Sequence, residues 1–272
     1  MPLTDLVRNL NSHHADSAPE FASQTPFVAA EGRVFANFAG IRLESAFVPV
    51  EETASGRLHG HAGVLKAYSF ATGIPLLPEA VFVLPTDDRE FVYLDRLVRT
   101  LHALNYLTHR APGNLLLPVH ARHIASVSSN HGLAFEEILR PCGLVPDPIT
   151  LEIEIDGQED TEHLKRAVRS YQARGYGIAL TRLGRGPINL DLVRALNPDI
   201  VKLDRPVLSA EQPLESLLDS IHRLGARVLV DGLDAATLTG QSALHLVDLI
   251  QAQAPLRRLI HAGGQPAIRT AA

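Results

Sequence analysis

Charged side chains gather where the apolar segments of this sequence end. The stretch "GIALTRLGRGPINLDLV" at 177–193 is typical of a strand that leads through a glycine-rich turn into a helix, and chemistry in parallel α/β folds concentrates at such strand ends. Carboxylates gathered there would suit Mg²⁺ or Mn²⁺. The residues at the successive strand ends are Pro118 and His120, Glu152 and Glu154, Thr181 and Arg182, Lys202 and Asp204, Asp231 and Asp234, and Asp248 and Gln251.

This set of residues offers acids but no convincing nucleophile. No GxSxG or HExxH motif accompanies it, which argues against a serine hydrolase or a zinc peptidase. Glu152, Asp204 and Asp231 would supply some oxygen ligands for a divalent ion. Arg182 would place a positive charge beside them, and that charge opposes metal binding by Coulomb repulsion. The residues alone therefore predict a weakened metal site.

Strands that alternate with helices must position these residues. Two apolar runs, "LESAFVPV" and "RLHGHAGVLKAY", are separated by too few residues for a crossover helix, so we expect an antiparallel hairpin. A helical stripe follows, with Arg96 and Arg99 expected on its solvent side, and a further helix is expected near 122–140. The later strands are nearly continuous apolar runs, typical of burial on both faces. We predict an α/β fold, a modified TIM-type (β/α)8 barrel with its first strand antiparallel; an open doubly wound sheet is the alternative, but no GxGxxG or P-loop favours it.

Composition sets limits on the class of protein. The chain has 272 residues, of which 46% are hydrophobic, and a formal charge of −5 without blocks of like charge, which argues against a nucleic-acid partner. Its single cysteine and the lack of a long apolar stretch predict a cytoplasmic protein without a membrane partner. We expect an N-terminal extension at 1–40 that is partly ordered or helical, the barrel at 41–262 and a tail at 263–272. Most of the 13 histidines are expected at the surface.

The order of motifs resembles the EAL domain, the family of cyclic di-GMP phosphodiesterases and their inactive relatives. "SAFVPVEETASGRLHGHAGVLKAY" is similar to the opening hairpin of the family, "ITLEIEI" to its LEITE strand, and "IALTRLGRGPINLDLVRALNPDIVKLDRPVL" to its DDFGTG loop and KID strand. "VLVDGLD" is similar to the AEGVE segment and "DLIQA" to the closing strand. Active members of the family use two divalent ions.

Carried over position by position, the resemblance implies that this EAL-like domain is degenerate. The glutamate that names the family falls at Ala62, the asparagine of the third strand at Pro118, and the paired aspartates of the fifth strand at Thr181 and Arg182. These positions imply that the chain binds no metal cofactor, although Mg²⁺ or Mn²⁺ is expected in active relatives. The remnant positions that the resemblance retains, two of them as Asp in place of Glu, are Glu152, Lys202, Asp204, Asp231 and Asp234.

Two roles are open for the cations near this site. Lys202 and Glu152 would form a buried ion pair, with Arg182 plugging the place where a metal would neutralise Glu152 and Asp204. The sharper hypothesis is that Arg182 or Arg185 contacts a phosphate or an acidic partner. The positions similar to ligand contacts in the family, taken with these two arginines, are Val48, Lys66, Arg182, Arg185 and Gln251.

The resemblance predicts a catalytically inactive domain that acts in bacterial signalling through protein–protein interaction. The partner is unknown; a regulator of transcription or motility is one class that fits, and a homodimer is a further expectation. Cyclic di-GMP would bind weakly or not at all. Two alternatives stay open, a cyclic di-GMP receptor with a degenerate pocket and a residual cyclic di-GMP phosphodiesterase.

Overall fold

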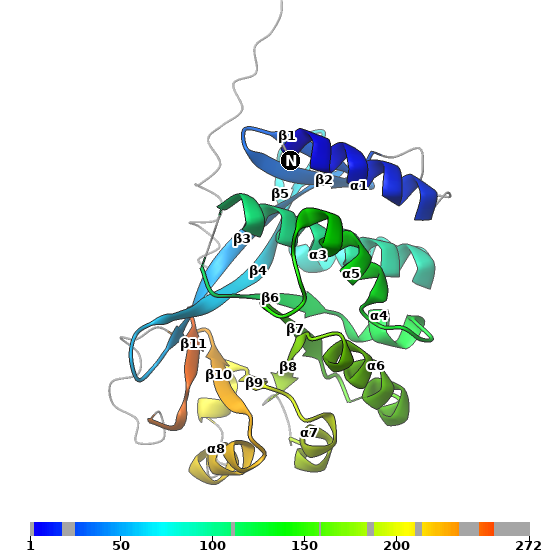
Figure 1. The fold of residues 1–272 in the computed structure, drawn as a ribbon. Coiled ribbons are helices and arrows are strands. Elements are labelled where there is room, and N and C mark those ends of the chain that lie inside the picture. The colour runs from blue at the N-terminus through cyan, green and yellow to red at the C-terminus, as the bar shows by residue number, and fades with distance from the viewer. Residues whose placement is uncertain are drawn as a thin grey trace, which may run out of the picture.

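Eight strands close into a barrel in the computed structural model, which describes residues 3–17, 25–109, 112–157, 159–183, 188–209, 214–233 and 245–252 (Figure 1). Strand β3 pairs antiparallel with both β4 and β11, and every other neighbouring pair in the barrel is parallel. The predicted barrel and its antiparallel first hairpin are therefore confirmed. The strands are β3 (Ile41–Glu52), β4 (Leu58–Ser69), β6 (Asn114–Val119), β7 (Ile149–Glu154), β8 (Gly177–Leu183), β9 (Ile200–Leu203), β10 (Arg227–Asp231) and β11 (Leu249–Gln251).

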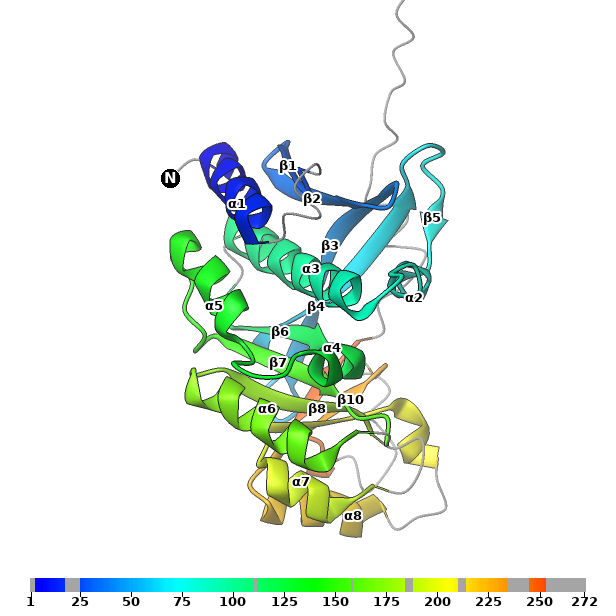
Figure 2. The same ribbon diagram turned by 90° about the vertical axis from the view of Figure 1, so that its right-hand side faces the viewer.

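Helices lie outside these strands (Figure 2). The single helix expected near 122–140 is instead two helices, because Asn130 and Gly132 both adopt positive φ, at 53° and 88°. Gly132 also abuts a ring, since a Cβ built on it would lie 2.9 Å from Cδ1 of Tyr171. The described helices are α1 (Leu3–Ser17), α2 (Pro78–Phe82), α3 (Asp88–His109), α4 (Ala121–Ser126), α5 (Leu133–Leu139), α6 (Thr161–Ala173), α7 (Leu190–Leu196) and α8 (Leu214–Arg223), with 3-10 turns η2 (Arg140–Cys142) and η3 (Arg205–Ser209).

The β3–β4 hairpin extends beyond the barrel and forms the centre of a second, antiparallel layer. Strands β1 (Phe27–Ala30), β2 (Arg33–Phe38) and β5 (Pro75–Leu76) extend it at its two edges. Helices α1 and α3 share one apolar cluster with these strands. Asn105 of α3 binds the backbone of β2 at Val34, which pairs with β1 but not with β3: its amide accepts from the N–H of Val34 at 3.0 Å and donates to the carbonyl of Val34 at 2.8 Å. Layer and barrel are therefore joined through shared strands.

The inside of the barrel is a small apolar layer, separate from the larger core between strands and helices. Because side chains alternate along a strand, residues two positions beyond this layer also face inward, at the carboxyl end of the parallel strands. That periodicity brings polar residues from β7, β9, β10 and β11 to one mouth of the barrel. The apolar layer beneath them consists of Val50, Ala62, Leu116, Ala179, Ile200, Leu229 and Leu249.

Candidate functional site at the mouth of the barrel

Lys202 is the centre of the polar cluster in the mouth. Its Nζ donates to Oε1 of Glu152 at 2.7 Å and to Oε1 of Gln251 at 3.0 Å, and lies 3.7 Å from Oδ2 of Asp231. The side chains of Lys202 and Glu152 are only 8% and 7% exposed, so the expected buried ion pair is present. Burial opposes the charged form, but the charges of Glu152, Asp231 and Asp204 outweigh it and raise the pKa of Lys202.

Arg182 has a different partner from the one expected. Strand β8 shifts register between Leu180 and Leu183, and Arg182 has a φ of 64°, in the left-handed region. This bulge re-aims the side chain, and Nε of Arg182 lies 3.1 Å from Oε1 of Glu154 on the neighbouring strand. The expectation that Arg182 plugs the space between Glu152 and Asp204 is therefore wrong: Lys202 is the cation bound to Glu152. Arg185 and Asp234 lie outside the described residues.

The remaining predicted positions carry few metal-binding atoms. Ala62 is 2% exposed and belongs to the apolar layer, and Pro118 pairs in register with Glu152. Thr181 pairs in register with Glu154 and contributes at most a hydroxyl. Within the described part of the chain, no group of three His, Cys, Asp or Glu residues could hold a metal ion. This donor set is a poor fit to a pair of divalent ions, which need several oxygen ligands each.

The predicted ligand contacts are not all brought together. Gln251 joins the Lys202 cluster, whereas Val48 is buried and pairs in register with Ala62. Lys66 lies farther along β4, in the second layer and opposite Glu44. Burial lowers the pKa of Lys66, while the charge of Glu44 opposes that shift.

A second polar cluster beside the mouth was missed by the sequence reasoning. Oδ1 of Asp95 lies 2.7 Å from Nδ1 of His120, and its Oδ2 lies 2.7 Å from Nη2 of Arg99 and 3.0 Å from Nδ1 of His123. The ring of His120 packs 4.0 Å from that of Phe82. Burial opposes ionisation of Asp95, but the charges of Arg99 and His123 keep the pKa of its carboxyl well below the usual range.

This cluster corrects two expectations from the sequence. Arg99 does not face solvent, since its side chain is 2% exposed, and His102, His123 and His131 are buried. A signal for it was present: Asp95 and Arg99 stand four residues apart on a helix, each directly after a residue of its apolar stripe, so an ion pair could form beside the buried face. Burial lowers the pKa of His120, but its hydrogen bond to Asp95 and the charges of Asp95 and Glu154 prevail and raise it.

Comparison with known proteins gives the same family on several grounds. The model of the EAL domain matches residues 34–246. The uncharacterized EAL-domain containing protein YkuI of Bacillus subtilis is 32% identical over 117 residues, which are 39% of this chain and 29% of that protein. This chain therefore matches under a third of the length of that curated relative.

In the part of the chain that the structure describes, no helix is both long and apolar enough to cross a membrane.

Solved EAL structures share the fold at low identity. The structure of YkuI with substrate c-di-GMP and calcium has a TM-score of 0.63 at 18% identity, covering 77% of this chain and 54% of that one. A PaMucR phosphodiesterase complex with c-di-GMP has a TM-score of 0.64 at 15% identity, covering 80% of this chain and 99% of that one. A standalone EAL protein of Vibrio cholerae in its c-di-GMP-bound form has a TM-score of 0.62 at 17% identity, covering 77% and 89%. With its family match across most of the sequence and its closed barrel, the chain belongs to the EAL domain family, related to c-di-GMP phosphodiesterases and c-di-GMP-binding proteins.

Proposed function

We propose that this EAL domain is catalytically inactive and acts in bacterial signalling through protein–protein contacts. The observation that carries the proposal is the composition of the barrel mouth, where Ala62, Pro118, Thr181 and Arg182 stand at positions that the family resemblance gives to metal ligands. Pro118 has no side-chain donor or acceptor, and Ala62 lies in an apolar layer. A barrel fold that persists without these metal ligands is consistent with a role for its surface in binding other proteins.

The charges of the mouth support the same conclusion. The carboxylate of Glu152 forms an ion pair with Lys202, and the carboxylate of Glu154 forms one with Arg182. A divalent ion bound near these carboxylates would face two cations already paired with them. Asp231, where the resemblance has glutamate, is one methylene shorter, and such a loss of reach displaces a ligand by about an ångström.

Hydrolysis of cyclic di-GMP tests the proposal directly. The protein is incubated with the dinucleotide and Mg²⁺ or Mn²⁺, and linear product is followed by chromatography. We expect no turnover above a blank without protein. Linear product that disappears in a folded Glu152→Gln variant would overturn the proposal and establish a residual phosphodiesterase instead.

A nucleotide receptor is the second candidate, favoured by the relatives solved with c-di-GMP and by the retained Gln251 and Glu152. Two positions argue for weak nucleotide binding. Val48 stands where the resemblance has a glutamine, and Lys66 stands where it has an arginine, whose bidentate geometry for holding phosphate a lysine lacks. Calorimetric titration separates the candidates. We expect no heat of binding at high micromolar nucleotide; saturable heat would make this domain a receptor.

The partner is proposed as a protein that regulates transcription or motility in the cytoplasm. A homodimer is a further proposal, tested by sedimentation, in which a mass of one chain at micromolar concentration would remove it. Neither proposal depends on nucleotide binding.

A further inference from the structure

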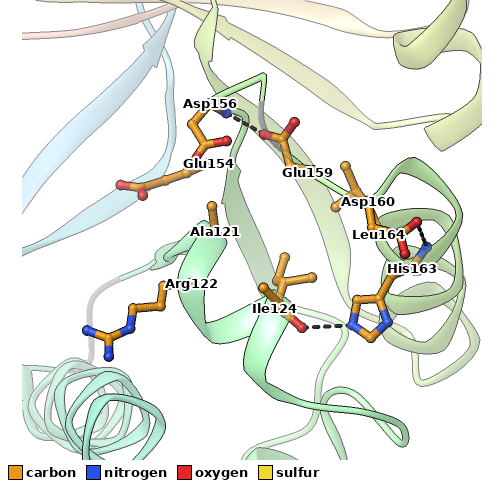
Figure 3. Close-up of a pocket in the computed structure, with 10 residues that line it drawn as sticks. Ala121, Arg122, Ile124, Glu154, Asp156, Glu159, Asp160, His163 and Leu164 are labelled. Carbon is orange, nitrogen blue, oxygen red and sulfur yellow. Dashed lines mark hydrogen bonds between the residues drawn. The ribbon is translucent and has the colours of Figure 1, made fainter. Parts of the chain in front are cut away.

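A cavity of about 370 Å³ opens between α4, the end of β7 and the start of α6 (Figure 3). Its apolar walls come from Ala121, Ile124, Ala125 and Leu164. We call it the α4–α6 pocket. Lys202 and its partners do not line it, so it is a different place from the polar cluster in the barrel mouth. Its volume suits one large apolar side chain or a small ring.

Carboxylates surround this apolar floor, and two of them are held in place by the backbone. Glu159 accepts hydrogen bonds from the N–H groups of Asp156 and Gly157, and Asp160 accepts from those of Glu162 and His163 at the start of α6. Figure 3 shows the carboxylate of Glu159 beside Asp156, after the end of β7, and that of Asp160 at the start of α6. These backbone donors fix the orientation of both carboxylates.

Arg122 and Arg182 beside the α4–α6 pocket have acidic partners, whereas Nη2 of Arg166 lies 3.3 Å from Nδ1 of the lining residue His163. Nε of Arg122 donates to Oδ1 of Asp88 on α3 at 2.9 Å, and Arg182 is paired with Glu154 at 3.1 Å. Nε2 of His163 donates to the carbonyl of Ile124 at 2.9 Å, which closes one wall. Four carboxylates line the α4–α6 pocket against one arginine, Arg122, so negative charge outnumbers positive charge among the lining residues; the four belong to Glu154, Asp156, Glu159 and Asp160.

We propose that the α4–α6 pocket docks a basic, amphipathic segment of a partner protein. One apolar side chain of that segment enters the cavity, and lysine or arginine residues on either side meet the acidic rim. Charge complementarity favours this occupant over anionic ones, which include cyclic di-GMP, nucleic acid and acidic membranes. An apolar anchor within a charged rim is the common arrangement of energetic contacts in protein interfaces. The inference rests on the proposed function, in which the domain acts through protein contacts.

An array of short synthetic peptides tests the pocket. Each peptide places one leucine or phenylalanine between lysine or arginine residues, and a matched set carries glutamate instead. The hits are titrated by fluorescence anisotropy against the full chain. We expect binding by the cationic set, a loss of about tenfold or more in affinity for Ala125→Phe, and a several-fold loss for Glu159→Gln. Ala125 is exposed on α4, so the ring fills the pocket without disturbing the core.

Asp191→Asn is the matched control, because it removes one negative charge from an exposed side chain of α7 outside the pocket. It should bind as the unmodified protein does, and binding should weaken as salt rises from roughly 50 to 300 mM. If Ala125→Phe fails to fold, Glu159→Gln carries the test. Equal binding by unmodified protein and both pocket variants, equal binding of glutamate peptides, or no binding by any cationic peptide would overturn the inference. If the protein hydrolyses cyclic di-GMP, the proposed function is wrong, but the peptide titrations still decide whether the α4–α6 pocket binds a basic segment.

Discussion

Glu152 contributes most to the charged state of Lys202, ahead of Asp231 and Asp204, and the side chains of Lys202 and Glu152 are almost fully buried. Removal of one partner from a buried pair leaves an uncompensated charge, which is more costly than the pair is stabilising. We expect Glu152→Ala to lower the free energy of unfolding by about 3 kcal/mol. Urea denaturation followed by circular dichroism measures it.

Arg182→Ala provides the comparison for this prediction. The side chain of Arg182 is 48% exposed, so loss of its pair with Glu154 should cost under about 1 kcal/mol. Equal losses for Arg182→Ala and Glu152→Ala would contradict the role given to burial.

His102 makes stability depend on pH. Burial lowers its pKa from 6.5 to about 3, and Nδ1 lies 2.9 Å from the hydroxyl of Ser45. In the unfolded chain the ring takes up a proton below pH 6.5, whereas in the folded protein it stays neutral. Its contribution is therefore full above pH 6.5 and is lost toward pH 3, at about 1.4 kcal/mol per pH unit.

Unfolding at pH 7 and pH 5 should show this loss, and His102→Asn should reduce it. His120 contributes with the opposite sign, because its raised pKa gives stability that is lost as the pH rises. A pH dependence identical in the unmodified protein and in His102→Asn would exclude His102 as its source.

Single residues also show where sequence reasoning succeeds. The acids at the strand ends were identifiable because a two-residue period is visible in the sequence, and Glu152 and Lys202 do meet as expected. The partner of Arg182 was not identifiable, since it depends on a bulge that only the register of β8 with β9 reveals. For the Asp95 cluster, the spacing of Asp95 and Arg99 was visible in the sequence, but the contact with His120 was not, because His120 follows a strand 25 residues after Asp95.

At the scale of the element, the break between α4 and α5 rests on Gly132. Its φ of 88° is strained for any residue with a Cβ, and that Cβ would also approach the ring of Tyr171. We expect Gly132→Ala to lower the free energy of unfolding by about 2 kcal/mol, from backbone strain and the close contact together. Thermal unfolding measures the change.

Gly143→Ala separates the two causes. Gly143 has a φ of 72°, but a Cβ there would have no atom within 4 Å. Gly143→Ala should therefore lower the free energy of unfolding only by the backbone strain, about 1 kcal/mol. A Gly143→Ala loss as large as that of Gly132→Ala would remove the steric part of the explanation.

Most strands and helices of the barrel were predictable, because the spacing of apolar residues indicates both their alternation and the opening hairpin. The split of the expected helix at 122–140 was harder to foresee, since "SSNHG" carries only moderate turn signals and the apolar pattern continues on both sides. Strands β1 and β2 were unforeseen because they are short, at four and six residues, and are held by pairing, β1 with β2 and β2 with β3.

At the scale of the whole molecule, α1 lies before the family match at 34–246 yet contributes to the core. Leu10 is 2% exposed in the cluster shared with α3. We expect Leu10→Ala to cost about 2 to 4 kcal/mol, as other buried leucines do. Arg8→Ala, on the exposed face of the same helix, is the control and should stay within about 0.5 kcal/mol. A negligible effect of Leu10→Ala in urea denaturation would show that α1 contributes little to the stability of the fold.

Strands β3 and β4 belong at once to the barrel and to the second layer, with β2 and β5 paired to them above and β11 and β6 below. Among the described residues the two layers share these continuous strands, so neither layer can rotate as a rigid body against the other without breaking strand hydrogen bonds. The described molecule should therefore melt in one cooperative transition. A partner that binds to either layer would then stabilise both layers against unfolding, because the two layers unfold together.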